Sequence, residues 1–320
     1  MTEIIQLSQI KEILKNIDPI QKIEEGFIAY SQGKVVVPPV GEMLFDDPPG
    51  DCHIKYGFIK KDDYYVVKIA QGFYNNPKIG LPSTNGLNIL FSQKTGAIIC
   101  ILLDEGYLTD VRTAAAGAVV AKYMAPRQVK QIGIFGYGIQ GKMQLEYLKS
   151  VVNCRNVLVW GRTQEGLEKY QKNMAHSGFN IQTTLDSGDV TDSCNLIVTC
   201  TPSKVPLITI DQVKKGTHIT AMGSDTSEKQ ELDSAILQIA DRVIVDSIAQ
   251  ATSRGESFQA MRNGKIKKDD LIELGNMISN KTLQRASDDE ITVADLTGVA
   301  IQDIQISKAV YEGLKLRNKS

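Results

Sequence analysis

A glycine-rich turn lies between an apolar run at residues 131–135 and a segment of helical spacing. In the pattern Gly136-x-Gly138-x-x-Gly141, the first glycine permits a tight turn and the second lets backbone N–H groups approach a pyrophosphate. The third lets the helix pack closely on the strand, and the helix N-terminus attracts the phosphates. The pattern therefore predicts a dinucleotide site, although a turn that binds nothing is the alternative. The predicted site residues here are Gly136, Tyr137, Gly138, Ile139 and Gln140.

The end of the next apolar strand bears on the type of dinucleotide. An acidic residue there would bind the ribose 2′-hydroxyl of NAD(H). The sequence has Arg162 and Thr163 instead. An arginine can form a charge-assisted hydrogen bond with a 2′-phosphate, and the threonine can add a hydroxyl. The sequence thus favours NADP(H), with NAD(H) possible, and a solvated arginine stacked on the adenine is the alternative.

A polar turn at residues 199–203 follows another buried strand. In a doubly wound sheet, the carboxyl ends of the strands line the ligand crevice. We therefore expect this turn to face the nicotinamide or its ribose, whereas Pro202 is explained equally well as a strand stop. The candidate residues are Thr199, Cys200, Thr201 and Ser203.

Several segments together suggest a family. They are residues 66–68, 111–116, 136–141, 199–203, 223–233 and 297–303. Their order and separation resemble the ornithine cyclodeaminase/mu-crystallin family over nearly the whole chain. The resemblance implies a Rossmann domain joined to a sheet domain that forms a homodimer. Within or beside these segments, Thr113, Met222 and Gly298 are further expected cofactor contacts.

The resemblance also implies a substrate site for an amino or imino acid. Arg112 and Lys68 would bind the substrate carboxylate, because a guanidinium can hold a carboxylate at two points. We expect Arg112 to open a helix, whose backbone N–H groups could also receive an anion. A domain-bridging ion pair is the alternative for Arg112, and a solvent-exposed edge-strand position is the alternative for Lys68. Asp225, in a Gly-Ser-Asp turn, would be the acid/base residue, with an ordinary turn aspartate as the alternative.

One departure from the family pattern concerns the substrate. The family often carries a Pro-x-Arg element whose arginine also binds the substrate carboxylate, but Val40 occupies that position here. His53 and Lys55 lie two residues apart on a predicted strand and therefore share a face. We hypothesise that one of them replaces the missing arginine, with a solvated strand face as the alternative.

The reaction favoured by the resemblance is redox-neutral cyclodeamination of L-ornithine or a related amino acid to a cyclic imino acid and ammonia. The first alternative is a cyclic imine reductase or an alanine-type dehydrogenase, which consumes cofactor in bulk. The second is a non-catalytic ligand-binding protein similar to mu-crystallin.

The elements that must position these residues fall into two groups. Short apolar runs broken by turn residues predict an antiparallel sheet, and alternating strands and helices predict a parallel one. We expect an α/β fold in which a Rossmann-type doubly wound sheet (116–299) joins an α+β substrate-binding and dimerisation domain (1–115, completed by a helix at 300–320). A short strand is predicted at 4–7, and antiparallel strands are predicted at 35–37, 53–59, 64–69, 86–91 and 97–103. The proline-rich stretch 38–50 is predicted as a loop, with helices at 19–32 and 112–124.

The composition excludes several other classes. The formal net charge of −1 argues against a nucleic-acid partner, and no apolar run is long enough to cross a membrane. The N-terminus lacks a signal-peptide pattern, so we expect a cytoplasmic protein. The five cysteines are scattered without metal-type pairing, and we expect no metal site.

Overall fold

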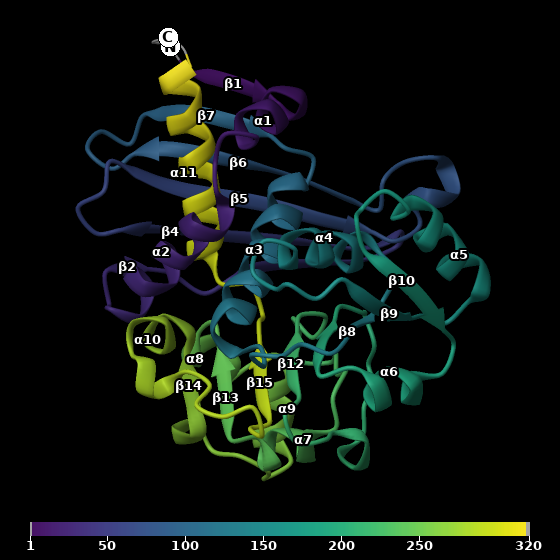
Figure 1. Ribbon diagram of the computed structural model, residues 1–320. Helices are drawn as coiled ribbons and strands as arrows, with labels where there is room; N and C mark the ends of the chain where they lie inside the picture. Colours follow the sequence, from purple (N-terminus) through teal and green to yellow (C-terminus); the bar gives the residue numbers. More distant parts are fainter. Residues whose placement is uncertain (1, 318–320) are drawn as a thin grey trace. The chain divides into compact units, whose positions relative to one another are not determined.

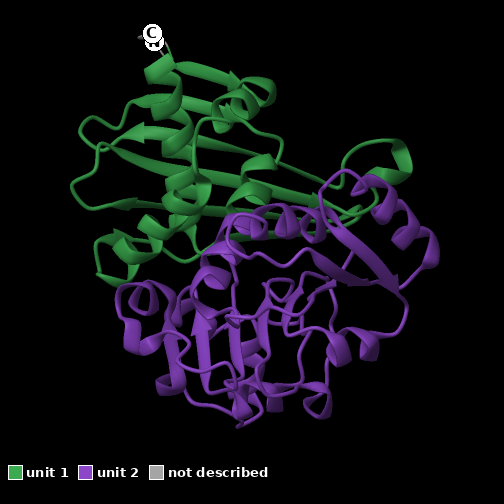
Figure 2. Cartoon of the chain, in the orientation of Figure 1, with its two compact units in different colours: residues 1–112, 299–320 green, residues 113–298 purple. Residues whose placement is uncertain are grey.

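The computed structural model describes residues 2–317, and the chain divides into two compact units (Figure 2). Unit 1 comprises residues 1–112 and 299–320, and unit 2 comprises residues 113–298. The boundary falls within helix α3 (Tyr107–Met124), between Arg112 and Thr113.

Unit 1 is built on a seven-stranded sheet of order β1-β7-β6-β5-β4-β2, with β3 also paired to β4. All pairs are antiparallel except β1 with β7. The strands are β1 (Glu3–Gln6), β2 (Val35–Val36), β3 (Gly41–Asp46), β4 (Pro49–Ile59), β5 (Tyr64–Phe73), β6 (Thr84–Ser92) and β7 (Ile98–Leu103).

The prediction of a loop across the proline-rich stretch 38–50 was wrong. It contains β3 and the start of β4, which form a hairpin with Asp47 and Pro48 in its turn. Prolines are compatible with this pairing because Pro48 lies outside both strands and Pro49 is the first residue of its strand, where a ladder N–H is least needed.

The helices of unit 1 cover one face of its sheet (Figure 1). They are α1 (Leu7–Leu14), α2 (Pro19–Ser31) and the long C-terminal α11 (Ala300–Arg317), with a short 3-10 turn, η1 (Asn76–Ile79), between β5 and β6. Asp18 caps α2 by accepting hydrogen bonds from the N–H groups of Ile20 and Gln21. Alternate residues of the central strands are buried on this face, including Val66, Lys68, Asn88 and Leu102. The face therefore holds polar groups as well as the core.

Unit 2 contains an eight-stranded, wholly parallel sheet of order β10-β9-β8-β11-β12-β15-β13-β14. The strands are β8 (Ile132–Phe135), β9 (Asn156–Trp160), β10 (Asn180–Thr184), β11 (Leu196–Thr199), β12 (His218–Ala221), β13 (Arg242–Val245), β14 (Leu271–Glu273) and β15 (Thr292–Asp295). The predicted α/β class, with one doubly wound parallel sheet and one antiparallel sheet, is confirmed.

Helices and 3-10 turns connect the parallel strands of unit 2. The helices besides α3 are α4 (Ile139–Leu148), α5 (Gln164–Asn173), α6 (Ser187–Ser193), α7 (Ser234–Ile239), α8 (Ile248–Ala251), α9 (Glu256–Arg262) and α10 (Leu274–Ser279). The 3-10 turns are η2 (Ile210–Gln212), η3 (Lys268–Asp270) and η4 (Lys281–Leu283). Alternate residues of β8 belong to two separate apolar clusters, with Ile134 in one and Phe135 in the other, because both faces of the sheet are covered.

Within residues 2–317, no helix has both the length and the apolar character needed to cross a membrane.

Candidate functional site

The glycine-rich turn of unit 2 joins β8 to α4 with the geometry of a phosphate cradle. Gly136 has a φ of +116°, which side-chain-bearing residues rarely adopt. A Cβ on Gly141 would lie 2.2 Å from the Gly136 carbonyl oxygen, so only glycine fits there. Gly138 caps α4, and a Cβ on it would meet no atom within 4 Å. The cradle is therefore tightly packed behind Gly141 and open at Gly138, which suits the pyrophosphate of a dinucleotide.

The ring of Tyr137 packs against the turn that follows β9. A Cβ on Gly161 would come within 2.1 Å of this ring, and the tyrosine oxygen lies 3.1 Å from Thr163 Oγ1. Thr163 also caps α5 by accepting a hydrogen bond from the Gly166 N–H. Its hydroxyl is therefore already engaged. Arg162, beside it, is exposed.

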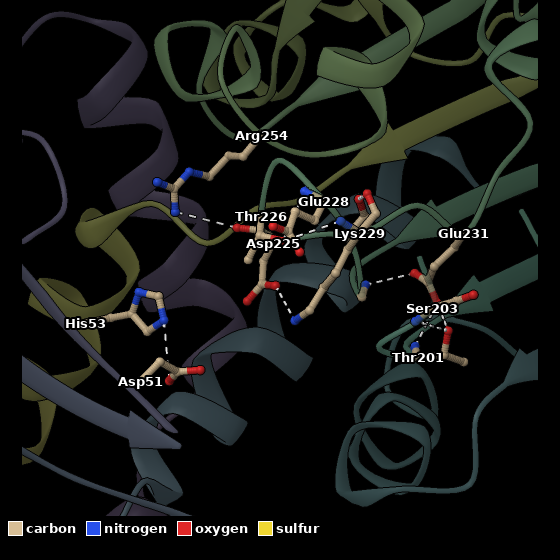
Figure 3. A network of polar contacts seen from close by, with 12 residues as sticks. Asp51, His53, Thr201, Ser203, Asp225, Thr226, Glu228, Lys229, Glu231 and Arg254 are labelled. Atoms are coloured by element: carbon tan, nitrogen blue, oxygen red, sulfur yellow. Dashed lines mark hydrogen bonds and ion pairs between the residues drawn. The ribbon is translucent and has the colours of Figure 1, made fainter. Parts of the chain in front are cut away.

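The polar turn after β11 is held by a buried glutamate that the sequence analysis did not assign to the site. Glu231 accepts hydrogen bonds from Thr199 Oγ1 (2.7 Å), Thr201 N (2.6 Å) and Thr201 Oγ1 (2.7 Å) through its two carboxylate oxygens. It also accepts one from Gly223 N at 2.8 Å (Figure 3). Burial raises the pKa of Glu231, although these donors act in the opposite direction. The glutamate thus ties the carboxyl ends of β11 and β12 together.

Cys200 lies in the same turn but has the character of a structural thiol. Its Sγ donates a hydrogen bond to the Phe135 carbonyl oxygen at 3.3 Å. Burial raises the pKa of Cys200, so the thiol stays protonated at neutral pH. We therefore expect Cys200 to pack beside a cofactor and not to act as a reactive group.

The remaining predicted cofactor residues are distributed over several elements of unit 2. Ser203 donates to the carbonyl oxygen of Val205, and the carbonyl oxygen of Thr113 accepts from Gln144 Nε2. The N–H of Gly298 donates to Asp246 at 2.6 Å. The remaining candidates, Ile139, Gln140 and Met222, lie in the first turn of α4 and directly after β12.

Asp225 lies in the loop after β12, with a half-exposed side chain. Its Oδ1 accepts a hydrogen bond from Lys229 Nζ at 2.6 Å (Figure 3). A partly solvated carboxylate beside an ammonium can exchange protons with a ligand or with water.

Three charged groups meet at the buried face of the unit 1 sheet. Lys68 Nζ lies 3.0 Å from Asp303 Oδ1, and Arg112 Nε lies 3.3 Å from the same oxygen. Arg112 Nη1 also donates to Gln302 Oε1 at 3.2 Å. Burial alone would raise the pKa of Asp303, but Lys68, Arg112 and Lys55 together hold it below its usual value. Sequence reasoning included Asp303 in the family pattern without giving it a role.

Lys55 lies beside this cluster. It is directly opposite Lys68 in the β4–β5 register, so the two lysines share a sheet face. Asn88 is opposite Lys68 on the other side, and its Nδ2 donates to Asp104 Oδ1 at 3.1 Å. Burial lowers the pKa of Lys68 and raises that of Asp104. Lys68 and Arg112 thus contact the Asp303 carboxylate, Lys55 acts on it electrostatically, and Asp104 is a second carboxyl group near Lys68.

Two expectations about these cations need correction. Arg112 does not open a helix, because α3 begins at Tyr107 and its start is fixed by Asp104, which accepts from the Leu108 N–H at 2.9 Å. The backbone N–H groups around Arg112 therefore belong to the helix interior. The alternative of an exposed edge position for Lys68 is also wrong, since β5 is an interior strand and the residue is 3 % exposed.

His53 lies on β4 between two carboxylates. Its Nδ1 is 3.2 Å from Glu42 Oε1, and its Nε2 is 3.4 Å from Asp51 Oδ1 (Figure 3 shows the second contact). These acids compete with any substrate carboxylate for the imidazole. Of the two residues hypothesised to replace the missing arginine, Lys55 is the one directly opposite Lys68.

Comparison with known proteins gives a consistent result across the chain. The chain is 36% identical to an uncharacterised cyclodeaminase of Sinorhizobium fredii, over 99% of this chain and 97% of that one. A structure of an archaeal alanine dehydrogenase dimer with bound NAD has a TM-score of 0.89 at 32% identity, covering 99% and 97% of the chains. The iminosuccinate reductase of Paracoccus denitrificans with NAD+ has a TM-score of 0.89 at 31% identity, with the same coverage.

The match to a family model extends over residues 1–318 and confirms the resemblance drawn from the sequence segments. The chain belongs to the ornithine cyclodeaminase/mu-crystallin family.

Proposed function

We propose that this enzyme interconverts an α-amino acid and its imino acid with net turnover of a nicotinamide cofactor. The observation that carries the proposal is the group of cationic side chains on one face of the unit 1 sheet, where Lys68 and Arg112 contact Asp303 and Lys55 lies opposite Lys68. Such a cluster attracts the carboxylate of the substrate. It also disfavours a terminal ammonium nearby, which cyclodeamination of ornithine requires.

The relatives support nicotinamide-dependent amino-acid chemistry, but their names refer to different reactions. Relatives named as a dehydrogenase and reductases match the chain at 31–35% identity. The cyclodeaminase name of the Sinorhizobium relative keeps redox-neutral cyclodeamination as the second candidate function. A non-catalytic binding protein would require the chain to have lost its proton-exchanging group, yet Asp225 is present.

The residues of each unit supply different parts of the proposed chemistry. In unit 1, Arg112 and Lys68 bind the substrate carboxylate, and Lys55 adds a third cation. In unit 2, the backbone of residues 136–141 holds the pyrophosphate, and Asp225 gives or takes the proton of the substrate nitrogen. When bound, the nicotinamide supplies or accepts the hydride. The balance is amino acid plus oxidised cofactor giving imino acid, reduced cofactor and a proton.

The cofactor we favour is NADP(H), with NAD(H) as the alternative. The support is Arg162, an exposed cation directly after β9, in the segment Trp160-Gly161-Arg162-Thr163-Gln164, which contains no carboxylate. The two similar structures given above contain NAD and NAD+. The preference for the phosphorylated form therefore rests on this arginine.

A homodimer is proposed from the second face of the unit 1 sheet. The side chains that alternate with the buried row of β5–β7 are apolar but remain partly exposed in the described chain. Among them are Tyr65, Val67, Ile69, Ile89, Phe91 and Ile101, and the rings of Tyr65 and Phe91 stack at 4.7 Å. A continuous apolar sheet face of this kind is stabilised by a partner, and a second copy presents the same surface. The similar alanine dehydrogenase structure is that of a dimer.

The proposed reaction is tested by replacing the cation that distinguishes this site. We expect Lys55→Met to raise the KM for the best amino or imino acid roughly 10-fold or more, as loss of a charged contact does, with cofactor affinity unchanged. Lys78→Met, at an exposed lysine of η1, is the control. The substrate panel is L-alanine, L-aspartate, L-ornithine, L-lysine and cyclic imines with NAD(H) and NADP(H). Unchanged kinetics in Lys55→Met would exclude its proposed role, and cofactor binding without turnover of any substrate would favour a binding protein.

A further inference from the structure

We propose that Lys229 is a positioning residue that holds the Asp225 carboxylate in place and keeps it ionised. The inference rests on the proposed acid/base role of Asp225. It goes further because a second residue, which is not among the proposed substrate and cofactor contacts, sets the pH at which that carboxylate takes up a proton.

The loop that carries both residues is held by hydrogen bonds between its own residues (Figure 3). Ser224 Oγ donates to the Lys229 carbonyl oxygen at 2.7 Å, and the Lys229 N–H donates to Thr226 Oγ1 at 3.3 Å. At its start, the loop is fixed by the hydrogen bond from Gly223 N to the buried Glu231. The backbone of Lys229 is therefore fixed relative to the turn that presents Asp225.

From this backbone the lysine side chain returns to the aspartate. Lys229 Nζ lies 2.6 Å from Asp225 Oδ1, and the lysine side chain is 27% exposed whereas that of Asp225 is 52% exposed. The ammonium is thus the more shielded partner, and the Asp225 side chain is the more exposed one. This arrangement suits a lysine that orients an acid for exchange with a ligand.

Two further contacts of charged side chains involve this loop. Arg254 Nη1 donates to the carbonyl oxygen of Asp225 at 3.5 Å. Glu228 pairs with Lys204 at 2.6 Å, with side chains 71% and 68% exposed. That pair has the same length and its glutamate lies on the same loop, but both of its side chains are solvated. It is therefore a matched control.

The physical consequence is a change in the protonation of Asp225. An ammonium in contact with a carboxylate favours its ionised form, so removing the charge lets the acid bind a proton at higher pH. We expect Lys229→Gln to move the titration midpoint of Asp225 upward by about 1 pH unit. Lys229→Arg restores the charge and keeps the midpoint near that of the unmodified protein.

The experiment is a carbon-13 NMR titration of the full chain labelled at aspartate side-chain carboxyls, with Asp225 assigned by the signal absent from Asp225→Asn. The expected result is an upward shift in Lys229→Gln and none in Lys229→Arg or Lys204→Gln. The acidic limb of kcat/KM, measured with the best substrate of the panel, moves in the same direction. An unshifted Asp225 signal in Lys229→Gln overturns the inference. Full activity in Asp225→Asn overturns the proposed role of Asp225 instead, while leaving the measured coupling intact.

Discussion

The ammonium of Lys68 lies 3.0 Å from the carboxylate of Asp303, and both side chains are almost completely buried. Both residues belong to unit 1, Lys68 on interior strand β5 and Asp303 in the first turn of α11. Two cations share this carboxylate, since Arg112 contacts it as well. The pair therefore joins the two chain segments that form unit 1.

Removing the shared carboxylate should destabilise the protein. Asp303→Asn leaves Lys68 and Arg112 buried without their counter-charge, which typically costs roughly 3–5 kcal/mol. The free energy of unfolding in urea measures this loss. Asp192→Asn, which breaks an exposed pair with Lys214, should cost about 1 kcal/mol or less. Equal stability of the two variants would show that the buried cluster does not hold unit 1 together.

Two substitutions in the glycine-rich turn should distinguish an effect on folding from an effect on cofactor binding. Gly141→Ala places a Cβ 2.2 Å from a backbone oxygen, so we expect loss of stability together with loss of dinucleotide binding. Gly138→Ala meets no protein atom within 4 Å and should fold normally. Its methyl group should nevertheless weaken dinucleotide affinity by crowding the pyrophosphate. Thermal unfolding and calorimetric titration with NADPH and NADH measure both effects, and unweakened binding in Gly138→Ala would place the phosphates elsewhere.

The choice of cofactor should depend on Arg162. We expect Arg162→Gln to lower NADPH affinity about 10-fold to 100-fold, the usual range for a lost charged hydrogen bond, and to leave NADH affinity unchanged. Fluorescence titration with both reduced cofactors provides the comparison. An equal loss for the two would indicate stacking on the adenine, and no loss for either would leave NAD(H) as the cofactor.

The stability of unit 2 should depend on pH through His218. Burial lowers the pKa of this histidine to about 3, and its ring lies between Thr292 Oγ1 and Thr220 Oγ1. Below pH 6.5 the unfolded chain binds a proton that the folded chain excludes, so the free energy of unfolding falls as the pH falls. Between pH 6.5 and pH 5 this amounts to about 2 kcal/mol.

His218→Gln isolates this contribution. A comparison of variants is needed because burial raises the pKa of Asp295 to about 7, which gives a slope of the opposite sign between pH 3.8 and pH 7. In urea unfolding, the stability of His218→Gln should fall less than that of the unmodified protein between pH 7 and pH 5. Parallel curves for the two proteins would contradict the neutral buried histidine.

The proposed dimer should separate when its apolar face is charged. Ile89→Lys puts an ammonium in the middle of that face, on β6, and we expect a monomer. Val205→Lys, at an exposed apolar residue of unit 2, serves as the control and should remain dimeric. Light scattering after size-exclusion chromatography gives the mass of each. A dimeric Ile89→Lys protein would exclude this face as the interface.

Sequence reasoning succeeded where local pattern and structure coincide. The strand, glycine turn and helix at 131–150 needed only neighbouring residues, and β8 followed by α4 appears there. It failed for β3, because proline content concealed a hairpin whose pairing partner decides its structure. It also left out β10, β14 and β15, whose sequences Asn-Ile-Gln-Thr-Thr, Leu-Ile-Glu and Thr-Val-Ala-Asp do not form the longer apolar runs that marked the predicted strands.

The candidate site likewise combines features that depend on neighbouring residues with features that depend on distant ones. The places of residues 136–141 and Arg162 after strands β8 and β9 could be predicted from the local sequence, and their roles in cofactor binding stay predictions. The roles of Asp303 and Glu231 were not, because each acts on partners up to 235 and 32 residues away. Spacing along the chain carries no signal for such contacts. Only the structure shows that each is a buried carboxylate in contact with several donors.

The central claim is net turnover of the cofactor, and its most direct test is stoichiometry. The absorbance of the reduced nicotinamide is followed while amino acid, imino acid and ammonia are quantified in the same reaction. The account predicts one cofactor oxidised or reduced for each substrate molecule converted. Release of ammonia from L-ornithine with formation of L-proline, at constant absorbance of the reduced nicotinamide, would contradict it and establish cyclodeamination instead.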